Sequence, residues 1–109
     1  MSTKLQDKTA ALAADRPLAT HQVIHDDDKT RITNWTMKPG EQTGWHSHDC
    51  DYVVIQLSGG RLHLDYADGT SREIDYAPGG TLSGKAPIEH NAISVGDEAI
   101  RSVEIEFKY

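Results

Sequence analysis

Two histidines separated by a single residue, His46 and His48, are the residues of this sequence best suited to chemistry. On a β-strand, side chains two positions apart point to the same face, so this spacing directs both imidazoles into one space. A third histidine, His90, follows later in the chain. Three imidazoles with open coordination positions would hold one divalent metal ion and leave room for a substrate. The alternative interpretation is three unrelated histidines that lie at the surface or in hydrogen bonds.

The imidazole ligands do not select one metal, because neutral imidazole suits Fe, Zn, Ni, Mn and Cu alike. Three neutral ligands leave the full 2+ charge of the ion at the site. Such a site favours an anionic or enolate-like substrate that completes the coordination shell.

Short β-like segments separated by turns must position these histidines. The segments alternate apolar and polar residues or are rich in β-branched residues, and Asp68-Gly69 is a strong hairpin signal. The expected strands are Thr20–Ile24, Thr30–Met37, Thr43–His48, Tyr52–Leu57, Arg61–Tyr66, Thr70–Tyr76, Thr81–Ser83, Ile88–Val95 and Ala99–Lys108. Many short strands at this spacing predict an antiparallel sandwich or barrel over residues 20–109. Residues 1–19, with several Ala and Leu, predict a short helix or a flexible tail.

Composition excludes several classes of partner. The 109 residues suffice for one domain, with 37% hydrophobic and 26% charged residues and a formal net charge of -6. The negative charge and scattered basic residues argue against nucleic acid, and no apolar run reaches the ~20 residues that cross a membrane. Cys50 is the single cysteine, which excludes an intrachain disulfide. With no apolar run of signal-peptide kind near Met1, these features favour the cytoplasm.

The histidines and glycines stand at the spacing of a known family. Gly40, His46, His48 and Gly59 resemble the first motif of the cupins, and Gly79 and His90 stand where the second motif has its glycine and histidine. The stretch from Trp35 through Trp45 to Val54 is similar, more narrowly, to a group of small single-domain bacterial cupins, some named for β-alanine degradation. The resemblance covers residues 23–107.

The resemblance implies an all-β fold, the double-stranded β-helix (jelly-roll) barrel, with a metal at its mouth. In the family, the paired histidines, a glutamate and the late histidine hold the metal. The glutamate position is Tyr52 here. The second motif departs further, with Lys85, Pro87 and Ser94 in place of its usual proline, glycine and asparagine. The resemblance therefore implies the fold, whereas the substituted motif positions change the ligand set that the family uses for its metal.

Tyr52 shares strand parity with His48, so we expect its side chain to point inward. Its hydroxyl could hydrogen-bond a bound water or substrate, ligate the metal as a phenolate, or serve only as the polar tip of a core aromatic. Asp51 is the other candidate fourth ligand, but it would need a local bulge to turn inward. An exposed carboxylate in a turn is the alternative for Asp51.

Five further residues are candidates for the pocket or the site. Gln56 and Arg101 share strand parity with residues that we expect to point inward, and Arg101 is on the same strand face as Val103. Either side chain could orient a polar substrate. An arginine that reaches solvent near the strand end is the alternative for Arg101. Trp45 is a candidate pocket wall or core residue, as is Trp35. Cys50 could be a soft ligand or a redox thiol, or a spectator thiol.

The sequence thus predicts a mononuclear metal-binding cupin. We expect an enzyme, dioxygenase-like or Lewis-acidic, that acts on a small organic acid or dicarbonyl metabolite, with Tyr52 as the candidate catalytic residue. The alternative is a non-catalytic metal- or metabolite-binding cupin, a sensor or accessory protein. Because an open jelly-roll edge invites strand pairing, we also expect a homodimer.

Overall fold

The computed structural model describes residues 16–108, and these form nine β-strands. The strands are β1 Thr20–Asp26, β2 Thr30–Met37, β3 His46–His48, β4 Asp51–Gln56, β5 Gly60–Tyr66, β6 Ser71–Tyr76, β7 Thr81–Gly84, β8 Ile88–Ser94 and β9 Ile100–Phe107. Each of the nine expected segments overlaps one of these strands, with ends that differ by a few residues, so the prediction of β-strands separated by turns is confirmed. The short helix or tail expected for residues 1–19 lies mostly outside the described residues.

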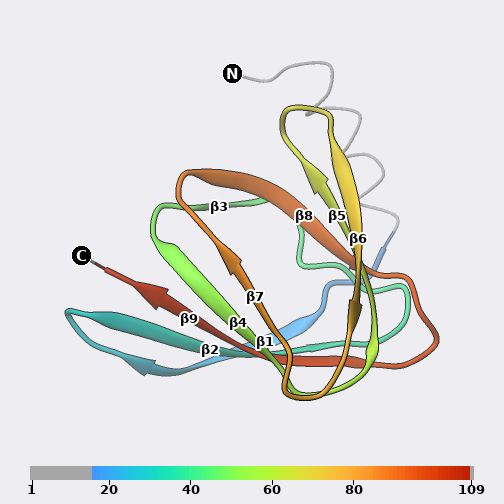
Figure 1. The fold of residues 1–109 in the computed structure, drawn as a ribbon, viewed down its shortest axis with the longest axis horizontal. Coiled ribbons are helices and arrows are strands. Elements are labelled where there is room, and N and C mark those ends of the chain that lie inside the picture. The colour runs from blue at the N-terminus through green and yellow to red at the C-terminus, as the bar shows by residue number, and fades with distance from the viewer. Residues whose placement is uncertain (1–15, 109) are drawn as a thin grey trace.

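The strands make two antiparallel sheets that face each other (Figure 1). The five-stranded sheet has the order β1-β2-β9-β4-β7, and the four-stranded sheet has the order β3-β8-β5-β6. The arrangement is the double-stranded β-helix, which confirms the expected all-β jelly roll. Within residues 16–108 the structure contains no helix that is long and apolar enough to span a membrane.

The hydrophobic core lies between the two sheets. Apolar side chains of the alternating strands meet there from both sides, as the period of two along a strand requires. The buried cluster consists of Met37, Leu62, Leu64, Tyr76, Ala92 and Ile100. The expected hairpin after β5 is present, and Gly69 adopts a φ of 90° at its tip, a conformation that favours glycine.

The face of strand β9 that points to the core is the opposite of the one expected from the sequence. The apolar residues Val103 and Ile105 were expected inside, together with Arg101. Instead Ile100 and Ser102 are buried, Arg101 is exposed, and Glu104 lines an internal pocket. Val103 and Ile105 occupy the outer face, where cross-strand partners from β2 and β4 leave them half-buried.

Candidate metal centre

Antiparallel pairing of β3 with β8 brings the three histidines together. In this ladder His46 lies directly opposite His90, and His48 lies two positions along on the same face of β3. A histidine pair on one strand and a histidine on its neighbour therefore meet at one point, although they are far apart in the sequence. The sequence-predicted grouping of His46, His48 and His90 is what the structure assembles.

The three Nε2 atoms form a nearly equilateral triangle. The distances are 3.0 Å from His46 to His48, 3.1 Å from His48 to His90 and 3.1 Å from His90 to His46. Nitrogen ligands bound about 2.1 Å from one ion are about 3.0 Å apart at right angles and about 3.4 Å apart at the tetrahedral angle. The observed spacing is close to that of neighbouring ligands on one ion. The donor set therefore fits one divalent metal ion.

The environment keeps the imidazoles neutral. Burial lowers the pKa of His46 and of His48, and burial together with the neighbouring histidines lowers the pKa of His90 to about 3. Nδ1 of His46 lies 2.8 Å from the carbonyl oxygen of Gly44, so Nδ1–H donates this hydrogen bond and Nε2 keeps its lone pair. A neutral imidazole with a fixed tautomer is the form that binds a metal.

A carboxylate lies on the other side of the His48 ring. Glu106 Oε2 is 3.5 Å from His48 Nδ1, and its other oxygen is 4.0 Å from an Arg31 guanidinium nitrogen. Because Nδ1 has no hydrogen-bond partner of good geometry, this contact is electrostatic at the distance observed. Glu106 favours an Nδ1–H tautomer of His48 and thus a free Nε2.

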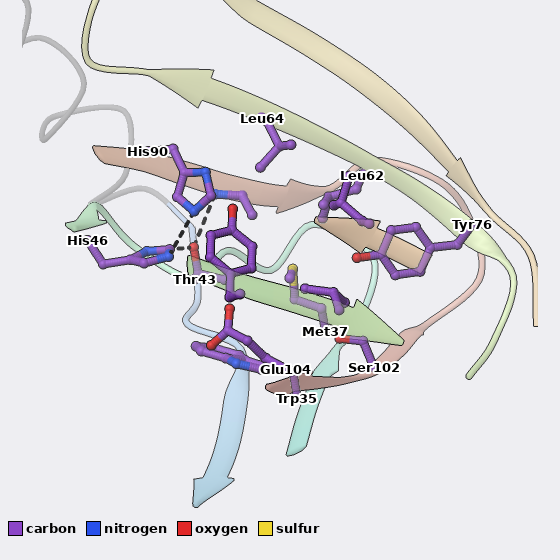
Figure 2. A pocket seen from close by; sticks show the side chains of 14 residues that line it. Trp35, Met37, Thr43, His46, Leu62, Leu64, Tyr76, His90, Ser102 and Glu104 are labelled. Atoms are coloured by element: carbon purple, nitrogen blue, oxygen red, sulfur yellow. Dashed lines mark hydrogen bonds between the residues drawn. The ribbon is translucent and has the colours of Figure 1, made fainter. Parts of the chain in front are cut away.

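The histidines open into an internal cavity between the sheets. Its volume is about 50 Å³, which corresponds to a few water molecules or one small organic molecule. Figure 2 shows His46 and His90 at one end, Glu104 and Trp35 below them, and a largely apolar other end with Met37, Leu62, Tyr76 and Ser102. The aliphatic residues that line the cavity are Met37, Val54, Leu62, Leu64, Leu82 and Ala92.

Known proteins resemble most of this chain, including the segments that carry the three histidines. The β-alanine degradation protein BauB of Pseudomonas aeruginosa is 37% identical over 93 residues, which cover 85% of this chain and 97% of that protein. The chain is a small bacterial cupin. A cupin domain from Bordetella pertussis agrees with this cupin at a TM-score of 0.80 and 36% identity, covering 86% of this chain and 97% of that domain.

More distant solved structures support the fold alone. An RmlC-like cupin with a double-stranded β-helix from Methanocaldococcus jannaschii has a TM-score of 0.71 at 12% identity, covering 85% of this cupin and 83% of that chain. No family model matches the sequence. The expected resemblance to the small bacterial cupins is therefore confirmed by whole-chain relatives.

In this cupin Tyr52, at the glutamate position of the first motif, is a buried aromatic beside the ligands. Its side chain points inward, as expected, and its ring centroid lies 4.3 Å from that of His48. Burial raises the pKa of Tyr52 to about 12, so the hydroxyl is protonated at neutral pH. A protonated hydroxyl can donate a hydrogen bond, which fits a role in hydrogen-bonding a bound water or substrate better than ligation as a phenolate. The backbone of Gly84 on β7 packs directly against the phenol ring.

The cavity contains a carboxylate that sequence reasoning missed. Glu104 on β9 lines the pocket, and its Oε2 lies 3.9 Å from His48 Nε2. Burial and the neighbouring Glu106 raise the pKa of Glu104 to about 7, while a hydrogen bond with the Trp35 side chain opposes the shift. Alternation along β9 was visible in the sequence, but nothing there showed that the polar face is the inner one.

The remaining candidate residues do not line the cavity. Asp51 Oδ1 accepts a hydrogen bond from the Ala86 amide, so it serves the loop before β8. Gln56 is buried, but its Oε1 accepts from the Ala77 amide and it does not line the cavity. Trp45 is half-buried and Arg101 is exposed, and neither borders the cavity.

Cys50 is a half-buried free thiol at a separate, polar depression of the surface. This depression is bordered by Arg31, Ser47, Asp49, Cys50, Glu106 and Lys108. The thiol therefore borders this depression and does not line the cavity beside the histidines.

Proposed function

We propose that this cupin binds one divalent transition metal through His46, His48 and His90 and acts as an enzyme on a small organic acid or dicarbonyl metabolite. The observation that carries the proposal is the convergence of three neutral Nε2 atoms, 3.0–3.1 Å apart, at the end of an internal cavity. Without a cation, three lone pairs at this separation repel one another, because they cannot all be paired in hydrogen bonds. Fe, Zn, Ni, Mn and Cu all suit this ligand set.

A bound ion would supply Lewis-acid chemistry, or O₂ chemistry if it is iron. The residues of the chain bind and orient what reacts. The Gly44 carbonyl holds the His46 ring in place, and the protonated Tyr52 hydroxyl can donate a hydrogen bond to an oxygen of the substrate. The apolar end of the cavity, including Leu62 and Leu64, excludes water from the reacting group.

The size and polarity of the cavity support a small substrate. About 50 Å³ accommodates only a few non-hydrogen atoms, and the end away from the histidines is largely apolar, with the hydroxyls of Tyr76 and Ser102 as its polar groups. A compact organic acid can place its oxygen atoms toward the metal and its carbon chain toward the apolar end. The name of the Pseudomonas relative, which concerns β-alanine degradation, is in keeping with a three-carbon acid of this kind.

The second candidate function is a non-catalytic metal- or metabolite-binding cupin, a sensor or accessory protein. The observation that favours it is the lining of the cavity, which within residues 16–108 includes no lysine or arginine to fix a substrate carboxylate. Metal binding without turnover of O₂ or of small acids would select this function.

The metal content of the untagged protein, measured by mass spectrometry, tests the proposal. We expect about one equivalent of a transition metal per chain, and a loss of at least ten-fold in His48→Ala/His90→Ala, since two of three ligands are gone. His63→Ala is the matched control, because His63 is a half-exposed histidine that contacts Asp65 and Glu73 instead. A wild-type protein that takes up no metal even after reconstitution would contradict the proposal.

We further propose that this cupin is a cytoplasmic homodimer. The five-stranded sheet is wider than the four-stranded sheet that faces it, and every residue of β1 is exposed. Val23 lies opposite the buried Thr33, so it belongs to the inner face, yet 47% of it is exposed. A second copy that covers β1 would bury this apolar surface and pair the open edge. The single cysteine is in keeping with a reducing compartment.

A further inference from the structure

Glu104 is a carboxylate in the wall of the cavity, close to the three histidines but separate from them. Its side chain is 14% exposed, and its Oε2 lies 3.9 Å from His48 Nε2. The ligand atoms of His46, His48 and His90 lie within 4.8 Å of one another, and Glu104 is outside this group. Because His46, His90 and Glu104 line the same cavity, a molecule bound to an ion on the histidines can reach Glu104 with a second group.

Glu104 has no cationic partner in the part of the chain that the structure describes. No lysine or arginine of residues 16–108 lines the cavity, and none forms an ion pair with Glu104. The Trp35 side chain donates one hydrogen bond to it, whereas an ionised carboxylate accepts about four. Glu106 on the same strand differs, since Arg31 lies 4.0 Å away. A cation that enters the cavity would therefore supply the partner that a buried carboxylate requires.

The surroundings of Glu104 suit an organic cation better than a second metal ion. The aromatic side chains of Trp35 and Tyr52 line the cavity with Glu104, and Figure 2 shows Trp35 next to it. Aromatic rings attract ammonium groups. A metal ion at this place would have to share His48, whose Nε2 already belongs to the triangle of the three histidines. An ammonium group needs no such ligand.

We propose, on the basis of the metal site proposed above, that the substrate is a small amino acid whose ammonium group binds Glu104 while a carboxylate oxygen binds the metal. Such a zwitterion places its negative end at the cation and its positive end at the buried anion. An acid without an ammonium group would leave Glu104 unpaired in the complex. The cavity volume of about 50 Å³ favours the shortest amino acids, with two or three carbons.

Calorimetric titration of the Zn²⁺-loaded protein at pH 8 tests this substrate class with two matched pairs of probes. Glycine and propionate have the same shape, as do β-alanine and butyrate, and in each pair a methyl group replaces the ammonium group. We expect at least one of the two amino acids to bind at least ten-fold more tightly than its methyl counterpart, because only the ammonium group forms a charged hydrogen bond with Glu104.

Two variants show whether Glu104 is the group that recognises the ammonium. Glu104→Gln keeps the shape of the side chain and removes its charge, so the preference for the amino acid should disappear while the protein still binds one Zn²⁺ per chain. Asp49→Asn is the matched control, because Asp49 is an exposed carboxylate near His48 that does not line the cavity. This control should keep the preference. Circular dichroism verifies that both variants are folded.

Each other outcome overturns the proposed substrate class in a distinct way. If the Zn²⁺-loaded wild type binds neither amino acid more tightly than its counterpart, no ammonium site exists and the metal site remains. If the preference survives in Glu104→Gln, or is lost equally in Asp49→Asn, Glu104 does not recognise the ammonium group. Two Zn²⁺ per chain that fall to one in Glu104→Gln would show a second metal ion instead. If the wild type takes up no Zn²⁺, the metal site and the ammonium site fail together.

Discussion

At the scale of single residues, the candidate metal centre combines groups whose protonation is shifted in opposite directions. Burial among other imidazoles lowers the pKa of His90 to about 3, which keeps its lone pair free for a metal. Burial without a cation raises the pKa of Glu104 to about 7. Both shifts have the same origin, because each group is most stable in its neutral form when the site holds no cation.

These shifts predict how the stability of the metal-free protein varies with pH. The unfolded chain binds more protons than the folded one at His90 between pH ~6.5 and ~3, so this group makes the free energy of unfolding rise with pH. At Glu104 the folded state binds more protons between pH ~4.5 and ~7, so this group makes the free energy fall as pH rises. The two contributions oppose each other between pH ~4.5 and ~6.5.

Glu104→Gln removes one of the two opposing contributions. We expect the free energy of unfolding of the metal-free variant to rise more steeply with pH between 5 and 6.5, by up to about 1.4 kcal/mol per pH unit. At pH 8, where the wild type buries an unpaired carboxylate, the variant should be the more stable by on the order of 1–3 kcal/mol. Urea unfolding at several pH values measures the pH dependence of the free energy of unfolding and the stability difference at pH 8. If the free energy of unfolding varied with pH in the same way in both proteins, the prediction would be contradicted.

At the scale of elements, β4 and the neighbouring strand β7 form one side of the site. Residues of β4 alternate between the cavity and the outer face, so Tyr52 and Val54 point inward. On β7 the residue opposite Tyr52 is Gly84, and a Cβ atom there would collide with the phenol ring. A glycine at this position thus leaves the space that the Tyr52 ring occupies beside His48.

Gly84→Ala is expected to destabilise the protein by about 1–3 kcal/mol, because either the ring or the β7 backbone must move. The cost should shrink in a Tyr52→Leu background, where the ring is absent, which gives a measurable coupling energy. Thermal or chemical unfolding of the two single variants and the double variant measures it. Ser83→Ala, at the exposed neighbouring position, is the control and should change stability little. Full additivity of the two substitutions would show that the contact is unimportant.

At the scale of the whole molecule, the two sheets differ in width, and β1 extends beyond the opposing sheet without being covered. If a second copy of the chain covers β1, a charge placed on the apolar inner face of β1 must weaken the dimer. The monomer itself should tolerate the change, since Val23 is already 47% exposed.

We expect Val23→Lys to shift the molecular mass, measured by light scattering during size-exclusion chromatography, from dimer to monomer at micromolar concentration. Val95→Lys, at a 43% exposed apolar residue after β8 on the other sheet, should leave the mass unchanged. A monomeric wild-type protein, or a dimer that survives Val23→Lys, would contradict the proposed arrangement.

The sequence by itself determined the strands and the histidine set. Alternation of apolar residues and the turn signals Asp68-Gly69 and Pro78-Gly79 are local, so they fix where strands begin and end without knowledge of the fold. The spacing of His46 and His48 is also local, because a period of two places both on one face of any strand. His90 was found through its resemblance to the cupin motifs.

Only the tertiary structure decided which polar residues join the histidines. A strand such as β9 has two faces, and a pattern of alternation does not say which one is inside when both can be half-buried. Here the pairing of β9 with β2 on one side and β4 on the other turned Glu104 into the cavity and left Val103 on the outer face. The same pairing exposed Arg101. These outcomes depend on contacts between strands far apart in the chain, which is why local patterns specified the strands but did not specify the carboxylate beside the site.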